Sequence, residues 1–214
     1  MSRATDLVAA IRRDLAAVER RIRSHPWLAA LEKRHVGLDA LAAFAGEQRL
    51  IIASDLRSFD SLAARCDEVR ARDFFLGMAK GEREALSRLD PFATAVGFSE
   101  PYEPRAACQA YPAFVAQLCR DGVPGEVAGA FLVNLDAWGA NCARVRDALR
   151  RRYGLDEEAV AFFDFFATPA PGFADDAARV VESDLAAGVP AGRIARASRL
   201  LQEYELLYWV GLPI

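Results

Sequence analysis

The chain has 214 residues, 53% of them hydrophobic, which is enough to bury a sizeable core. We expect one domain that spans residues 1–214. The 27 basic and 30 acidic residues give a net charge of −3. This balance excludes the basic excess that draws a protein to nucleic acid or to an anionic membrane surface, so small molecules and other proteins remain as partners.

The N-terminal segment and the cysteines indicate the cellular compartment. Residues 1–15 mix acids and arginines with apolar residues and therefore lack the continuous apolar segment of a secretory signal. No apolar run is long enough to span a bilayer. We expect a cytoplasmic protein with free thiols, because there is no CxxC pair among its four cysteines, Cys66, Cys108, Cys119 and Cys142.

Apolar residues recur at spacings of three and four along every long segment, whereas the alternation typical of strands is almost absent. The sequence therefore predicts an all-α protein. A first helix should follow Thr5, as its N-terminal cap, and end at His25-Pro26. A short second helix is expected from Trp27 to His35, and a long third helix from about Leu38 to Ala64.

The middle of the chain predicts three further helices. The fourth should run from Arg70 to Leu89 and end at Asp90-Pro91. Residues 91–104 contain several prolines and are expected to form a loop that crosses the domain. A fifth helix directs Tyr111 inward, and after a turn at residues 122–125 a sixth helix continues to about Tyr153.

The C-terminal part predicts three more helices. Asp156 should cap a short, very apolar seventh helix at residues 157–168, which the prolines that follow close. The eighth should cover about Phe173 to Ala187, and the ninth Ile194 to Leu212.

One acid in the ninth helix occupies a position that a helix normally gives to leucine. At about 100° per residue, Glu205 lies near the centre of an apolar sector that also holds Leu201, Tyr208 and Trp209. Burying an unpaired carboxylate costs several kcal/mol unless it is neutralised, hydrogen-bonded or hydrated. Glu205 is therefore interpreted either as a structural carboxylate or as an acid that lines a ligand cavity.

Other helices also direct polar side chains toward the interior. Gln48 lies at the centre of the stripe of the third helix with Asp55 close by, whereas Glu47 is expected at its margin or beyond. Tyr111 faces inward on the fifth helix, and Asn134 borders the inward side of the sixth. Such a cluster in an apolar bundle is typical of a small-ligand site, although each residue alone could simply satisfy a buried backbone group.

The sequence offers little for a metal or a cofactor. Helical bundles often bind paired irons through Glu-x-x-His motifs, but the chain has only His25 and His35 and no such motif. A phosphate-binding glycine loop, GxSxG and HExxH are also absent from the sequence. Haem ligation by His25 alone is the one alternative that the sequence leaves, and we expect neither a metal nor a cofactor.

Several segments together resemble the TenA family. They are His25-Pro26-Trp27 at a helix break, residues 44–59 (FAGEQRLIIASDLRSF), Tyr111, and residues 204–209 (YELLYW). The resemblance covers essentially the whole chain and implies a haem-oxygenase-like multi-helical bundle. The family includes thiaminase-type enzymes, with the cofactor-free oxidase PqqC and CADD-type proteins as relatives. Its Glu-x-x-Phe-Trp motif, which contains the acid/base glutamate, is similar to Glu205-Leu-Leu-Tyr-Trp209 here.

The resemblance implies a catalytic role for Glu205 and a place for Tyr111 in a pyrimidine pocket. Gln48 stands where the family has an aspartate that grips the aminopyrimidine, so it offers hydrogen bonds but no charge. The family's cysteine nucleophile, in a Pro-Cys-x-x-x-Tyr pattern, aligns with Asn134, and Trp138 follows at the position of the tyrosine. An amide is not a comparable nucleophile, so thiaminase chemistry by the standard route should be lost.

Two further departures concern alternative chemistry. Cys142 lies two helical turns beyond Asn134 and could replace the nucleophile only if the substrate sat differently. The oxidase and di-iron relatives would need several histidines, including one near Phe165-Phe166, which this chain lacks.

Three hypotheses follow. In the first, the chain is a metal-free hydrolase of a small heterocyclic, pyrimidine- or thiamin-related metabolite, with Glu205 as the acid/base. In the second, it is a non-catalytic member of the fold that binds a metabolite or a partner protein, and in the third its inward polar residues bond only one another. A homo-oligomer, dimer or tetramer, is expected from the resemblance. The candidate substrate-binding residues are Gln48, Asp55, Tyr111, Asn134, Trp138 and Tyr208.

Overall fold

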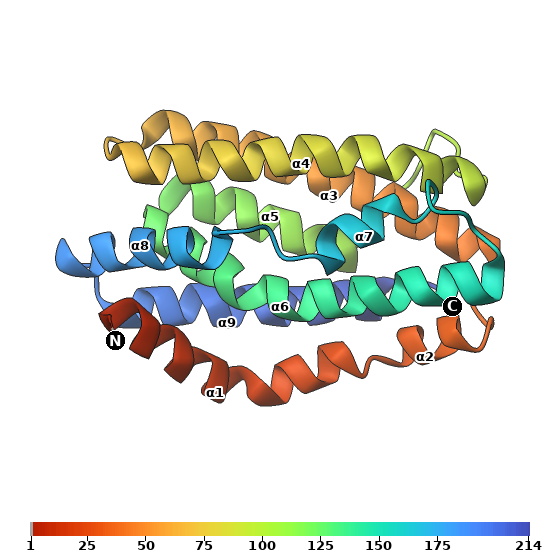
Figure 1. Cartoon of the computed structure of the whole chain (residues 1–214), viewed down its shortest axis with the longest axis horizontal. Coiled ribbons are helices and arrows are strands. Elements are labelled where there is room, and N and C mark those ends of the chain that lie inside the picture. Colours follow the sequence, from red (N-terminus) through yellow and green to blue (C-terminus); the bar gives the residue numbers. More distant parts are fainter. Residues whose placement is uncertain (1) are drawn as a thin grey trace.

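The computed structural model describes residues 2–214, which form an elongated bundle whose long helices run roughly along its length (Figure 1). The described residues contain helices and no strand, which confirms the all-α prediction. The elements are α1 (Arg3–Arg23), α2 (Pro26–Glu32), α3 (Leu38–Arg65), α4 (Val69–Ala95), α5 (Ala106–Asp121), α6 (Pro124–Ala148), a π-helical turn (Leu149–Tyr153), α7 (Ala161–Ala167), α8 (Phe173–Ala186) and α9 (Ala191–Gly211).

The packing of the helices places the last one at the centre. Helix α9 packs against α1, α5 and α6, and α3 packs against α4 and α5. Helix α7 bridges α6 and α4 near the middle of the bundle (Figure 1). The apolar side chains form two buried clusters, and Tyr111 packs against both. Its position between the clusters puts the inward face of α5 next to α6 and α9.

Helix α1 begins earlier than the sequence predicted. Ser2, not Thr5, is the N-terminal cap, and its Oγ accepts a hydrogen bond from the Thr5 amide at 3.2 Å. Serine is as good a cap as threonine, and a cap accepts from the amide two or three residues further on. Thr5 therefore lies inside the first turn.

Helix α4 does not end at Asp90-Pro91 as predicted but continues through Pro91 to Ala95. An interior proline costs roughly 3 kcal/mol because it lacks an N–H and crowds the preceding turn. Phe92 is fully buried in the next position and meets Phe44 and Phe163 edge to face. This aromatic packing offsets the proline, and the loop that follows is correspondingly shorter than the predicted residues 91–104.

Two short helices are shorter than predicted. Helix α2 ends at Glu32, because Arg34 has a left-handed backbone conformation with φ of 60°. Helix α7 begins at Ala161 instead of at residue 157. Asp156 does cap this region, but it accepts from the Ala159 amide at 2.9 Å in a turn that precedes the helix.

The remaining expectations on helices and thiols agree with the structure. The helical segment that starts with α6 reaches Tyr153 through the π-helical turn and ends at Gly154, where φ is 73°. The four cysteines are buried and free, as predicted. Within residues 2–214, we find no helix with the length and apolar character needed to cross a membrane.

Candidate functional site

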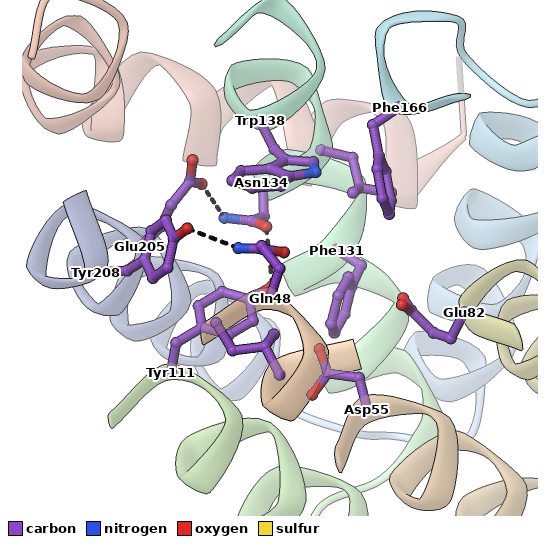
Figure 2. A pocket seen from close by; sticks show the side chains of 12 residues that line it. Gln48, Asp55, Glu82, Tyr111, Phe131, Asn134, Trp138, Phe166, Glu205 and Tyr208 are labelled. Carbon is purple, nitrogen blue, oxygen red and sulfur yellow. Dashed lines mark hydrogen bonds between the residues drawn. The ribbon is translucent and has the colours of Figure 1, made fainter. Parts of the chain in front are cut away.

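A cavity opens among α3, α4, α5, α6, α7 and α9, and all seven predicted site residues line it (Figure 2). Its empty space, mouth included, is about 480 Å³, and about 50 Å³ of this admits the centre of a water molecule. One water needs on the order of 10–15 Å³ of such space, so several waters or a small planar molecule fit. The lining residues are Gln48, Ile51, Asp55, Glu82, Tyr111, Phe131, Asn134, Leu135, Trp138, Phe166, Glu205 and Tyr208.

Glu205 is 2% exposed and is held by two donors from different helices. Its Oε2 accepts from Asn134 Nδ2 at 2.5 Å, and its Oε1 accepts from Trp209 Nε1 at 3.2 Å. Burial raises the pKa of Glu205 to about 8, although these two hydrogen bonds act in the opposite direction. A carboxyl group with this pKa is mostly protonated at neutral pH and can both donate and accept a proton.

Asn134 connects the polar groups of three helices. Its Nδ2 also donates to Gln202 Oε1 at 3.1 Å, and its Oδ1 accepts from the Tyr111 hydroxyl at 3.2 Å. With an exposed fraction of 2%, Asn134 is buried on α6, and it does not merely border the inward side. The chain of hydrogen bonds from Tyr111 through Asn134 to Glu205 therefore fixes the acid relative to α5 and α6 (Figure 2).

Gln48 and the aromatic residues form another wall. Gln48 Nε2 donates to the Tyr208 hydroxyl at 2.8 Å. The amide oxygen of Gln48 is not used in this hydrogen bond. Trp138 meets both Tyr208 and Phe166 edge to face, with ring centroids 6.1 and 5.9 Å apart. Aromatic walls with a few polar groups are typical of sites that hold planar rings.

The cavity also contains a pair of acids, of which the sequence predicted only one. Asp55 on α3 was a candidate, but Glu82 on α4 was missed, and Figure 2 shows the two carboxyl groups on the same side of the cavity. Glu82 continues the series Phe75, Ala79, Glu82 at helical spacing, which could have revealed it. Burial raises the pKa of Glu82 to about 8 and raises the pKa of Asp55 well above its usual range, and Glu82 raises that of Asp55 further.

Glu47 was expected at the margin of α3 or beyond, and this expectation was wrong. Glu47 is fully buried and accepts three hydrogen bonds, from the Tyr102 hydroxyl, the Arg105 amide and Gln109 Nε2, each at 2.7 Å. The segment before α5 folds over this side of α3, which the periodicity of α3 alone cannot reveal. Glu47 does not line the cavity, and its three donors give it a structural role.

Cys142 does not serve as a replacement nucleophile in this arrangement. It is 1% exposed and is not among the residues that line the cavity. Burial raises the pKa of its thiol well above the usual range, and Glu205 raises it further, so the reactive thiolate is disfavoured. Within residues 2–214, no three His, Cys, Asp or Glu side chains are grouped so that they could hold a metal ion.

Comparison with known proteins places this geometry in a family. The model of the family described as TENA/THI-4/PQQC matches residues 12–168. The chain belongs to the TENA/THI-4/PQQC family. The matched residues include Gln48, Asp55, Tyr111 and Asn134, whereas Glu205 lies C-terminal to them on α9. No curated protein sequence gives a significant match.

Solved structures of TenA proteins share the fold. A TenA homologue from Pyrococcus furiosus superposes with a TM-score of 0.78 at 16% identity, over 97% of this chain and 100% of that one. A TenA family transcription regulator from a Silicibacter species gives a TM-score of 0.76 at 14% identity, over 97% of each chain. A Shewanella denitrificans domain of unknown function with a heme oxygenase-like fold gives 0.71 at 14% identity, over 94% and 87%. The predicted haem-oxygenase-like bundle and the divergent TenA membership are thereby confirmed.

Membership in the TenA family does not assign the site residues. The roles inferred for Glu205, Tyr111 and Gln48 stay predictions, because low identity establishes the fold alone. What the structure adds is that these side chains, which lie on separate helices of this TenA protein, face one cavity.

Proposed function

We propose that this TenA protein binds a small heterocyclic, pyrimidine- or thiamin-related metabolite in the cavity and hydrolyses it, with Glu205 as the general acid and base. The observation that carries the proposal is a buried carboxyl group whose pKa is raised to about 8 and which lines an aromatic-walled cavity. A group that titrates near the working pH transfers protons most effectively in both directions.

Water takes the place of the missing cysteine in this reaction. Protonated Glu205 donates its proton to the leaving atom of the substrate, and the bond between that atom and carbon breaks. A water molecule adds its oxygen to the carbon and returns a proton to the carboxylate, so Glu205 ends as it began. Asn134 and Trp209 hold the carboxylate between the two transfers, because both donate hydrogen bonds to its oxygens.

The direct experiment is turnover of thiamin, aminopyrimidines and related heterocycles by the purified protein, followed by chromatography. Glu205→Gln should lower kcat/KM by roughly 100-fold or more on any substrate found, since general acid–base catalysis contributes about that much. Glu203→Gln is the matched control, because Glu203 lies on the same helix with its side chain exposed and paired with Arg199. Equal activity of Glu205→Gln and the wild type would refute the mechanism.

Binding without turnover is the alternative function, and Asn134 favours it. The residue at the position of the family's nucleophile here holds Glu205 and Tyr111 in place instead of attacking a substrate. A regulatory role would agree with the description of the Silicibacter neighbour as a transcription regulator. A metabolite that raises the melting temperature and is never converted would support this alternative.

We also propose that the protein acts as a homo-oligomer, dimer or tetramer, in the cytoplasm, as the family resemblance implies. Size-exclusion chromatography with light scattering measures the mass in solution. A monomer at micromolar concentration would contradict this part of the proposal.

A further inference from the structure

One side of the cavity holds two acids and no cation. Asp55 projects from α3 and Glu82 from α4, and Figure 2 shows both carboxyl groups beside Phe131, away from the pair formed by Glu205 and Asn134. Asp55 is 3% exposed, and its Oδ1 is buried without a hydrogen-bond partner in the described chain. A buried acceptor left unpaired costs about 1–3 kcal/mol, and more if it is charged.

The protein satisfies its other buried acids, which makes Asp55 an exception. Glu47 has three donors, and Glu126 accepts from the Val123 amide and pairs with Arg193 at 2.8 Å. Asp55 has no such support, and the arginine next to Glu82, Arg83, pairs with the exposed Asp60. A purely structural role therefore does not account for the open acceptor of Asp55.

The carboxyl groups that line the cavity have no basic side chain beside them in the lining. The residues that line it in the described chain include three carboxyl groups and no lysine, arginine or histidine. A cleft of one sign concentrates ligands of the opposite sign. In their ionised forms the three acids would repel an anionic ligand, whereas a cation would offset the cost of ionising the two buried acids Asp55 and Glu82.

We propose that Asp55 and Glu82 form a subsite for a planar cation that carries N–H donors, such as an amidinium or a guanidinium. Two N–H groups on one planar cation match the oxygens of a carboxylate, and paired charge-assisted bonds of this kind are strong. Tyr111, Phe131 and Phe166 supply aromatic walls for the attached ring. The proposal rests on the proposed function, because it describes the ligand of the same cavity, and it adds the chemical class of that ligand.

The subsite also supplies the charge that Gln48 lacks. Asp55 lies seven residues after Gln48 on α3, which is about two helical turns, so both residues face the same cavity. The Gln48 amide nitrogen donates to the Tyr208 hydroxyl and its oxygen is neutral, whereas Asp55 has a carboxyl oxygen without a partner in the described chain. On α3, therefore, Asp55 and not Gln48 provides the negative charge that a cationic ligand needs.

Binding of the cation should release a proton from the acid pair. Burial raises the pKa of Glu82 to about 8 and that of Asp55 well above its usual range, so the pair holds at least one proton at neutral pH, and a cation binds the deprotonated form. Affinity should therefore increase as the pH rises from 6 to 8.5. The other titratable groups that act on this end of the cavity are Tyr111 and Cys119 of α5 and Glu205 of α9, whereas α6 and α7 contribute only uncharged side chains to the lining.

The test uses benzamidinium as the probe and benzamide as its neutral counterpart of nearly the same shape. Calorimetry on the full chain should show benzamidinium binding at pH 8 and at least tenfold weaker binding of benzamide. Asp55→Asn and Glu82→Gln should each weaken benzamidinium binding at least tenfold, and Asp60→Asn, an exposed acid on α3, should leave it unchanged. Titration in two buffers of different ionisation heat should reveal proton release.

The outcomes separate this proposal from the proposed function. Equal affinity for benzamide and benzamidinium, or wild-type affinity in both Asp55→Asn and Glu82→Gln, would overturn the subsite. Loss of benzamidinium binding in Asp55→Asn and Glu82→Gln tests the subsite, whereas loss of turnover in Glu205→Gln tests the proposed function, so the two can fail separately. The two acid variants are checked independently for folding by circular dichroism, and Glu82→Gln provides a second test of the same subsite at a less deeply buried acid.

Discussion

Among single residues, Asn134 has a direct influence on the pKa of Glu205. Its amide donates to Glu205 and to Gln202, and its oxygen accepts from Tyr111. The hydrogen bond to Glu205 stabilises the carboxylate form and so opposes the effect of burial. The pKa of about 8 is the balance between burial, which raises it, and the hydrogen bonds from Trp209 and Asn134, which lower it.

Asn134→Leu should therefore raise the pKa of Glu205 further above its present value. Leucine has a similar size but no donor, so only burial and the Trp209 bond would remain. The carboxyl carbon shift of Glu205, followed by NMR as a function of pH, measures this, with exposed Glu203 as the internal control. The loss of three hydrogen bonds should also lower the free energy of unfolding by roughly 1–3 kcal/mol. An unchanged Glu205 titration would contradict this account.

Asp55→Asn should stabilise the unliganded protein, in contrast to most substitutions of buried residues. Asparagine removes a carboxyl group whose Oδ1 has no partner and whose pKa is raised by burial and by Glu82, so the gain should grow as the pH rises from 6 to 8.5. For a chain of this size each kcal/mol corresponds to roughly 2–4 °C in Tm. Thermal unfolding at both pH values checks this, and a lower Tm than that of Asp60→Asn at pH 8.5 would be the contrary result.

Among the helices, the close contact between α6 and α7 determines the shape of one wall of the cavity. A Cβ at Gly139 on α6 would lie 2.7 Å from the backbone oxygen of Phe166 on α7. The absence of a side chain at Gly139 lets α7 approach α6 and brings Phe166 next to Trp138. Gly139 thus determines the position of Phe166 in the wall of the cavity.

Gly139→Ala should therefore displace α7 and destabilise the protein by roughly 1–3 kcal/mol through overpacking. Ligand affinity should fall as well, because Phe166 leaves its place. Gly77→Ala is the matched control, since a Cβ there meets nothing within 4 Å in the exposed middle of α4. That control should gain up to about 1 kcal/mol from helix propensity. Chemical denaturation of both variants tests the contrast, and equal effects would contradict it.

The sequence was informative about elements where the apolar stripe is regular. It located the inward faces of α3, α5, α6 and α9, and hence Gln48, Asp55, Tyr111, Asn134 and Glu205, which all line the cavity. Helix ends were less predictable, because they depend on tertiary contacts. Helix α4 continues past Pro91 only since Phe92 is packed by aromatic residues from other helices.

The site itself was predicted incompletely for a related reason. Glu82 lies on the helix whose course was least clear, directly after the second of two glycines that weaken the helical pattern. Glu47 is buried by a segment more than fifty residues further along, as its bond to Tyr102 shows. Such contacts between distant segments cannot be read from the periodicity of one helix.

The whole molecule should lose stability as the pH rises from about 5 to 8. Folding raises the pKa of Glu205 and of Glu82 from 4.5 to about 8, so the folded state binds protons more tightly than the unfolded state. The stabilisation from these protons is complete below the unfolded pKa and is lost as the pH passes the folded pKa. Urea unfolding at intervals of half a pH unit measures it.

Variants at the three acids should flatten this pH dependence. The combined Asp55→Asn, Glu82→Gln and Glu205→Gln protein lacks the groups that release protons on ionisation in the folded state. Its free energy of unfolding should change less between pH 5 and 8 than that of Glu203→Gln. A wild-type protein that gains stability over this range would show that the acids are not buried in the way described.

The position of α9 has a consequence for synthesis. Ribosomes deliver the chain from its N-terminus, and domains begin to fold from that end. Glu205, Trp209 and Tyr208 belong to the last helix, which packs between α1, α5 and α6. A nascent chain that lacks this helix has Asn134 and Tyr111 without Glu205, so ligand binding cannot assist folding until α9 has been made. The cavity is therefore completed only when α9 takes its place against the helices that precede it.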